Sequence, residues 1–235
     1  MTAIGDGHGQ YSIDHARLLE PTPLPSGFKR KNPKAFRFQP YSRKIRRRLD
    51  IYTSILYDLW VSVEWDTSVR TFNDRVAPIP IGETSGKVFY FAPPIVTMNN
   101  EGECIVHALQ ESEPDPCKLE SLENWAKTNR VTFKIWAPEE IRSNPVELEN
   151  RKQLYAYISS PETVISPAFR EKVLLVLRRY RKTTLDDLVE SVSDASAEQV
   201  IQIVAEQIQQ RNIHSDIHKY QLGWSTEISY FHEFA

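Results

Sequence analysis

Residues 29–48 form the part of this sequence whose composition most clearly indicates a chemical role. Ten of these twenty residues are lysine or arginine, none is acidic, and three aromatic residues are interleaved with them. Like charges at this density repel one another and destabilise a fold, so they favour a surface that contacts phosphate groups. We therefore predict a DNA-binding surface made of ten basic side chains: Lys29, Arg30, Lys31, Lys34, Arg37, Arg43, Lys44, Arg46, Arg47 and Arg48.

A second interpretation of the basic segment is neutralisation inside the same fold. Residues 101–123 contain seven aspartate or glutamate residues and one lysine, so acidic partners are available along the chain. Exposed ion pairs of this kind contribute little stability. Under this interpretation the basic side chains pair with acids of the same chain and do not bind nucleic acid. Both interpretations stay open at the level of the sequence.

Side chains that could perform catalysis are harder to find. A metal-dependent nuclease needs carboxylates that hold a hard cation. Glu123 and Lys127 stand four residues apart in a predicted helix, a spacing typical of a surface ion pair. We interpret His107, alone in an apolar strand, as a core histidine. The sequence also lacks a phosphate-binding glycine loop and a paired CxxC motif, so we assign no catalytic residue, metal ligand or cofactor.

Composition and charge exclude several classes of protein. The chain has 235 residues, 40% of them hydrophobic, and a net charge of −2. Its two cysteines exclude a disulfide-stapled scaffold, and no apolar run approaches the roughly 20 residues of a membrane helix. The first ten residues lack the charged start and apolar core of a signal peptide. We therefore expect a cytoplasmic protein that does not bind membranes.

The elements that position the basic segment are predicted from hydrophobic spacing. Residues 1–28 are expected to form a flexible tail, with the alternative that part of it folds onto the body through Ile13, Leu18 and Leu19. The following residues read as an α/β domain with a mixed sheet flanked by helices. Its helices are expected over 49–65, which carries the core residues Trp60 and Trp65, and 119–128, and its strands over 68–75, 87–95, 104–109 and 131–136.

The C-terminal third reads as helices followed by a hairpin. Two helices are expected within 137–159, a linker over 159–167, then helices over 168–182, 183–192 and 196–212 and strands over 212–217 and 225–231. Thr184 and Asp187 resemble a capping box. Three helices followed by a hairpin are typical of a winged-helix domain, here over 165–235. Its third helix offers polar residues that either read DNA bases or leave the domain to dock proteins: Glu198, Gln199, Gln202, Glu206, Gln207, Gln209, Gln210 and Arg211.

The order of these segments resembles the TnsA family, the endonuclease subunit of heteromeric cut-and-paste transposases. The segment FxFxPYSRKIRR leads into a helix, VEWDTSVRTF stands where the family has a Leu-Glu-Phe-Asp run, and FYFAPPIVT stands near its Tyr-Thr-Pro-Asp-Phe strand. A further match lies in the helices before the linker, through Glu140, Ile141, Arg142, Asn150 and Leu154. The resemblance implies a restriction-endonuclease-like core over 29–160 and a C-terminal winged-helix domain.

The sequence departs from this family where the family's catalytic residues would stand. Pro94 replaces the aspartate of one strand, and Ile105 and His107 replace the glutamate and lysine of the next. We therefore expect a catalytically inactive transposition protein that binds transposon-end DNA. The resemblance implies two protein partners, a transposase subunit and an AAA+ ATPase that docks on the C-terminal domain. Two alternatives stay open: a winged-helix DNA-binding regulator, and a metal-dependent endonuclease that uses other acids, such as Asp74, Glu83, Glu101 or Glu103.

Overall fold

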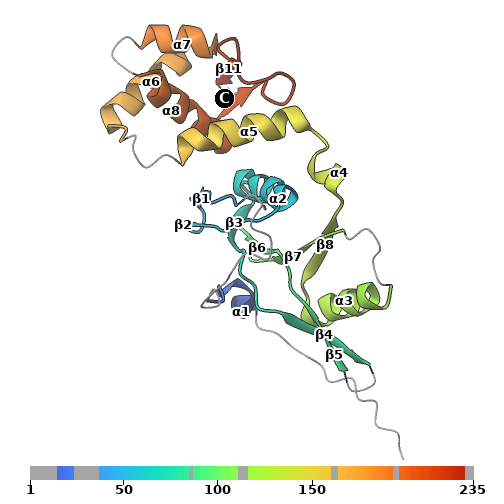
Figure 1. Cartoon of the computed structure of the whole chain (residues 1–235). Coiled ribbons are helices and arrows are strands. Elements are labelled where there is room, and N and C mark those ends of the chain that lie inside the picture. The colour runs from blue at the N-terminus through green and yellow to red at the C-terminus, as the bar shows by residue number, and fades with distance from the viewer. Residues whose placement is uncertain are drawn as a thin grey trace, which may run out of the picture. The chain divides into compact units, whose positions relative to one another are not determined.

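A computed structural model describes residues 15–23, 37–84, 87–110, 116–159, 164–192 and 196–230 (Figure 1). The chain divides into two compact units. The sheet unit comprises Met1–Phe38, Ile51–Leu56 and Ser68–Ile141, and the helical unit comprises Gln39–Asp50, Tyr57–Thr67 and Arg142–Ala235. The sequence instead predicts one boundary between these domains, at residues 160–165. In the structure, residues 142–159 and the segments 39–50 and 57–67 belong to the helical unit, whereas the sequence places them in the first domain.

A four-stranded mixed sheet forms the centre of the sheet unit. Its strands are β3 (Val69–Asn73), β6 (Ile95–Asn99), β7 (Cys104–Leu109) and β8 (Thr132–Trp136), in the order β3-β6-β7-β8. The pairs β3–β6 and β6–β7 are antiparallel, whereas β7 and β8 are parallel. Helix α3 (Pro116–Asn129) provides the crossover that a parallel pair requires. The predicted mixed α/β class is therefore confirmed.

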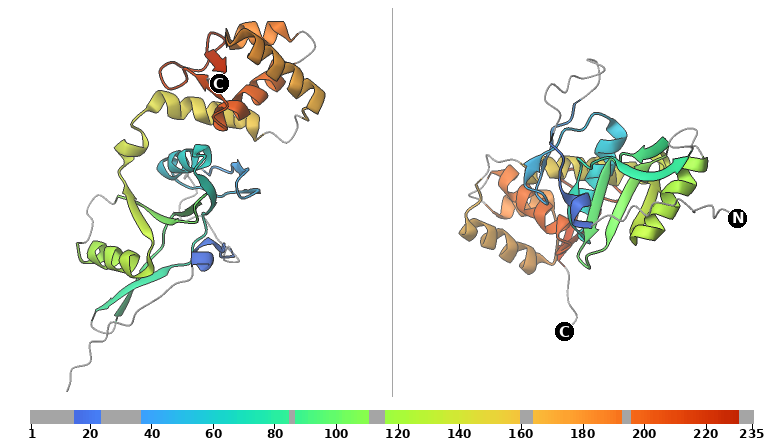
Figure 2. Two further views of the ribbon diagram at one scale, coloured as in Figure 1. Left: turned by 180° about the vertical axis from the view of Figure 1, so that it is seen from behind. Right: turned by 90° about the horizontal axis from the view of Figure 1, so that it is seen from below.

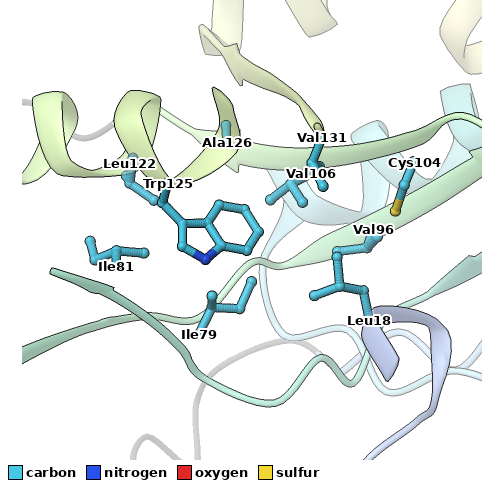
Figure 3. Close-up of a cluster of buried hydrophobic side chains, with 10 residues drawn as sticks. All are labelled: Leu18, Ile79, Ile81, Val96, Cys104, Val106, Leu122, Trp125, Ala126 and Val131. Carbon is cyan, nitrogen blue, oxygen red and sulfur yellow. The ribbon is translucent and has the colours of Figure 1, made fainter. Parts of the chain in front are cut away.

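The core of the sheet unit lies between the sheet, α3 and a hairpin that the sequence analysis missed. Strands β4 (Ile79–Thr84) and β5 (Lys87–Phe91) pair with each other, and Ala92-Pro93-Pro94 separates β5 from β6 where one long strand was expected. Trp125 of α3 points toward Ile79 and Ile81 of β4 (Figure 3). The cluster of buried side chains comprises Leu18, Ile79, Ile81, Val96, Cys104, Val106, Leu122, Trp125, Ala126 and Val131.

Part of the predicted tail belongs to this core. Helix α1 (His15–Leu19) buries Leu18, which is 3% exposed, and the Nδ2 of Asn73 donates hydrogen bonds to the carbonyls of Leu18 and Glu20. The expectation of a flexible tail is therefore wrong for residues 15–23, because a buried leucine and a buried amide hold them on the sheet unit. Residues 1–14 and 24–28 lie outside the described residues.

The helical unit packs its helices around a second core (Figure 2). Its helices are α5 (Pro145–Ile158), α6 (Pro167–Tyr180), α7 (Leu185–Ser191) and α8 (Ala197–Gln209), and α2 (Ser54–Trp65) contributes its residues from Tyr57 onward. Strands β9 (Lys182–Thr184), β10 (Ile213–Ser215) and β11 (Glu227–Tyr230) form an antiparallel sheet in the order β10-β11-β9. The short helix α4 (Pro138–Ile141) ends the sheet unit.

Local sequence signals account for the helix starts. Asn144, Ser166, Thr184 and Ser196 are the N-caps of α5, α6, α7 and α8, and each side chain accepts a hydrogen bond from a backbone N–H three residues later. The hydroxyl of Thr184 also donates to the Asp187 carboxylate at 2.7 Å. In a capping box this carboxylate would accept from the backbone N–H of Thr184, so here a bond between side chains takes the place of that backbone bond.

Helix α2 starts five residues later than its hydrophobic spacing predicts. Leu49 and Ile51 are buried, and Ile51 forms an antiparallel bridge with Phe38. These alternate positions are extended because the N–H of Leu49 donates to the carbonyl of Pro40, and the backbone groups of Ile51 pair with those of Phe38. Trp60 and Trp65, predicted to be core residues, are 0% and 6% exposed.

Candidate nucleic-acid interface

The described half of the basic segment forms a short hairpin. Strands β1 (Tyr41–Ser42) and β2 (Arg47–Arg48) pair antiparallel, and residues 43–46 make the turn between them. We call residues 41–48 the basic hairpin. Of the predicted DNA-binding residues, Lys29, Arg30, Lys31 and Lys34 lie outside the described residues, and Arg37 is exposed just before the hairpin.

A buried carboxylate on α2 holds the turn of the basic hairpin. Glu64 is 1% exposed. Its Oε1 accepts hydrogen bonds from the backbone N–H groups of Arg43 at 3.0 Å and Lys44 at 3.3 Å, and its Oε2 accepts from the Ser42 hydroxyl at 2.7 Å. Donors from the turn therefore offset the cost of burying this charge and fix the shape of the turn.

A tyrosine from α5 completes the Glu64 site. The Tyr155 hydroxyl lies 2.8 Å from Oε1 of Glu64, and the Tyr155 ring contacts the ring of Trp60 edge-on, with 5.2 Å between ring centroids. Burial, and then the neighbouring carboxylate, raise the pKa of Tyr155 far above its usual value. The phenol therefore stays protonated and remains a hydrogen-bond donor to Glu64.

Two of the predicted DNA-binding side chains have partners within the helical unit. Nη1 of Arg43 lies 3.0 Å from Oε1 of Glu206, a buried residue of α8, and Arg170 of α6 binds the other carboxylate oxygen. Nζ of Lys44 donates to the carbonyl of Asp66, and burial lowers the pKa of this lysine despite the acids beside it. Neutralisation thus occurs for Arg43, but through Glu206 and not through residues 101–123.

Arg46 and Arg48 are the arginines of the basic hairpin that are available to a ligand. Arg46 and Arg48 are exposed, and within the described part of the chain neither guanidinium forms an ion pair. Arg47 is half-buried, and its Nη1 donates to the carbonyl of Arg48 at 3.4 Å. The result is a cationic turn with a rigid, buried anchor, which can hold phosphate groups in one geometry.

Helix α8, for which the sequence left DNA reading open, buries several of its polar residues within the helical unit. Gln202, Glu206 and Gln207 are 8%, 4% and 7% exposed, and α5 packs against the helix. The side chain of Gln209 donates to the backbone carbonyl of Glu64 at 3.1 Å. The burial of these three side chains disfavours entry of α8 into a major groove, because a reading helix must present such side chains to solvent.

The position expected for a nuclease centre contains a structural histidine. His107 is 5% exposed, its Nδ1 accepts a hydrogen bond from Nε1 of Trp136 at 2.8 Å, and its Nε2 lies 2.9 Å from the hydroxyl of Thr97. The donor from Trp136 places the histidine proton on Nε2. Burial, followed by the charge of Lys134, lowers the pKa of His107 to about 4, so the imidazole is neutral near pH 7. The prediction of a core histidine is confirmed.

The alternative catalytic acids do not gather in the sheet unit. Asp74 follows the end of β3 that pairs with Val96, whereas Glu101 and Glu103 lie in the turn beyond the opposite end of the same strands. Glu83 belongs to the β4–β5 hairpin. Among the described residues, no group of three or more His, Cys, Asp or Glu side chains is placed to hold a metal ion.

The residues that carry the family resemblance in the C-terminal part have structural partners. Nε of Arg142 lies 2.6 Å from Asp58, a buried acid of α2 that also binds Lys152 of α5 at 2.7 Å. Asn150, 1% exposed, donates to the carbonyls of Ile217 and Tyr220 at 2.7 Å and accepts from the N–H of Leu222. The amide therefore ties the loop between β10 and β11 to α5.

Sequence reasoning assigned no role to the two buried acids of α2. One signal was present: Asp58 and Glu64 interrupt a helix whose other buried positions are apolar. A charge on the apolar face of a helix needs a partner, and this pattern alone could have marked both residues.

The comparisons of the sequence with protein families and with curated proteins found no match. The structure adds one negative observation, made on the described residues: none of their helices combines the length and apolar character of a membrane span.

Proposed function

We propose that this protein binds DNA through the basic hairpin and serves as a non-cleaving transposition protein resembling TnsA. The observation that carries the proposal is that Arg46 and Arg48 are exposed on the basic hairpin, whose turn is anchored by buried Glu64. A rigid cationic turn favours phosphate contacts, which position a protein on DNA without reading its bases.

The role in transposition extends this proposal and depends on the sequence resemblance. In this role the protein binds transposon-end DNA and holds the transposase subunit, and its C-terminal winged-helix domain docks an AAA+ ATPase. The order of α6, α7 and α8 with the β9–β11 sheet supports the winged-helix assignment. The burial of α8 favours protein docking by this domain over sequence reading.

The direct test replaces Arg46, Arg47 and Arg48 together with alanine and measures DNA affinity at several salt concentrations. Each phosphate contact contributes about −0.9 to the slope of log K against log salt, so the triple variant should flatten the slope by roughly one to three units. Sequence preference should stay unchanged, because phosphate contacts carry no base information.

A matched control removes the same charge from another exposed site. Arg70 of β3, Lys127 in the last turn of α3 and Arg130 just after that helix are exposed, so their triple alanine variant also lowers the net charge by three. The proposal predicts that the hairpin variant flattens the salt slope much more than this control. An unchanged slope in a folded hairpin variant would remove the DNA-binding proposal.

A further inference from the structure

Four arginines of this structure occupy backbone conformations in which glycine is the usual residue. Among the described residues, the non-glycine positions with positive φ are Arg46 at 51°, Arg130 at 53°, Arg181 at 59° and Arg211 at 59°. A side chain in this left-handed region costs about 1 kcal/mol relative to glycine, and asparagine or aspartate are the usual exceptions. All four arginines are exposed, so core packing does not explain their retention.

Two of these arginines belong to segments that meet at Glu64 in the helical unit. Arg46 closes the turn whose N–H groups at Arg43 and Lys44 bind the Glu64 carboxylate. Arg211 follows the end of α8, where Gln209 donates to the backbone carbonyl of the same Glu64 at 3.1 Å. Both arginines therefore flank the C-terminal end of α2.

Neither arginine has a structural partner that accounts for its charge. Within the described residues, the guanidinium groups of Arg46 and Arg211 form no ion pair. A cation at a helix C-terminus gains about 0.3–1 kcal/mol, which could offset the backbone cost at Arg211. The same account does not apply to Arg46, which closes a hairpin turn and does not end a helix.

We infer that Arg46 and Arg211, which belong to two segments that both bind Glu64, contact the same stretch of phosphodiester backbone. This inference rests on the proposed function and extends the DNA-binding surface from the basic hairpin to the end of α8. Guanidinium groups suit this ligand because they present several donors to phosphate oxygens. The residues around α8 thus contribute to DNA binding through the helix end, while its buried polar face holds the unit together.

The test uses glycine, because glycine removes the charge and also relieves the backbone conformation. Arg46→Gly and Arg211→Gly should each flatten the salt slope of DNA binding by about one unit, and the double variant by about two. Their melting temperatures should stay equal or rise, so a loss of affinity cannot come from unfolding. Arg211→Lys should keep the slope, since it keeps the charge.

Arg130→Gly is the matched control, because it makes the same backbone and charge change at the end of α3 in the sheet unit. A salt slope that Arg211→Gly leaves unchanged, or that Arg130→Gly flattens equally, would overturn this inference. Failure of the proposed function is distinguishable: in that case the unmodified full chain shows no salt-dependent DNA binding, and the alanine triple variant of the hairpin changes nothing.

Discussion

Glu64 offers a prediction whose sign opposes simple electrostatics. Replacing Glu64 with glutamine removes a negative charge beside the basic hairpin, and charge alone would then strengthen DNA binding. We expect the opposite, a weaker affinity, because the carboxylate holds the turn of the hairpin that carries Arg46 and Arg48. The acid is needed for the cationic surface to keep its shape.

The magnitude follows from the four donors on this carboxylate, at distances of 2.7–3.3 Å. Hydrogen bonds to a charged group contribute about 1.5–3 kcal/mol each, and neutral ones about 1 kcal/mol. Glutamine keeps one acceptor oxygen and turns an NH₂ group toward the Ser42 hydroxyl, which then has to accept. We expect a loss of about 1–3 kcal/mol in unfolding free energy for Glu64→Gln. Glu64→Ala should lose about 3–5 kcal/mol, because it leaves buried donors without a partner.

The assay pairs chemical denaturation with DNA affinity measured by fluorescence anisotropy. Glu198→Gln is the control, because it removes the same charge from an exposed position near the start of α8. The control should leave stability unchanged and affinity equal or slightly higher. A Glu64→Gln variant with unchanged stability and equal or higher DNA affinity would refute the role of Glu64 as the anchor of the hairpin.

Three further predictions concern other parts of the molecule. His107 has a pKa of about 4 in the folded protein against 6.5 in the unfolded chain, so unfolding takes up a proton at acidic pH. The free energy of unfolding should therefore fall by up to about 3 kcal/mol as the pH drops from 6.5 to 4. His107→Gln should lack this pH dependence in urea denaturation. Asn150→Ala removes three buried hydrogen bonds and should destabilise the protein by about 2–4 kcal/mol, seen as a lower melting temperature. The purified chain should not cut DNA with Mg²⁺ or Mn²⁺ in a nicking assay, and cutting that one substitution at Asp74 or Glu103 abolishes would contradict the non-cleaving proposal.

Much of the secondary structure could be predicted because its causes are local. The spacing of apolar residues in α8 and the caps Thr184 and Ser196 determine their helices within a few residues of sequence. Strand β4 escaped prediction because Pro80 and Gly82 weaken its strand signal, and only pairing with β5 makes it a strand. Pairing with a distant segment also explains why residues 49–53 are not helical, because Ile51 forms a bridge with Phe38.

The candidate site likewise has features that the sequence predicts and features that depend on the tertiary structure. The charge density of residues 29–48 is a property of the sequence, and it predicts a phosphate-binding surface without any structure. Which arginines of that segment are available was not predictable, since Arg43 pairs with Glu206 across 163 residues of sequence. Long-range ion pairs depend on which surfaces the folded chain brings together, and a periodic pattern contains no such information.

The sequence by itself determined a basic segment, amphipathic helices and apolar residues at the positions where the resemblance predicts the acids of a nuclease. Only the tertiary structure decided that Glu64 lies buried against Tyr155, 91 residues away in sequence, and orders the basic hairpin. The physical reason is that a buried charge is tolerated only where donors converge on it. Those donors come from β1, its turn and α5, which meet only in the folded helical unit.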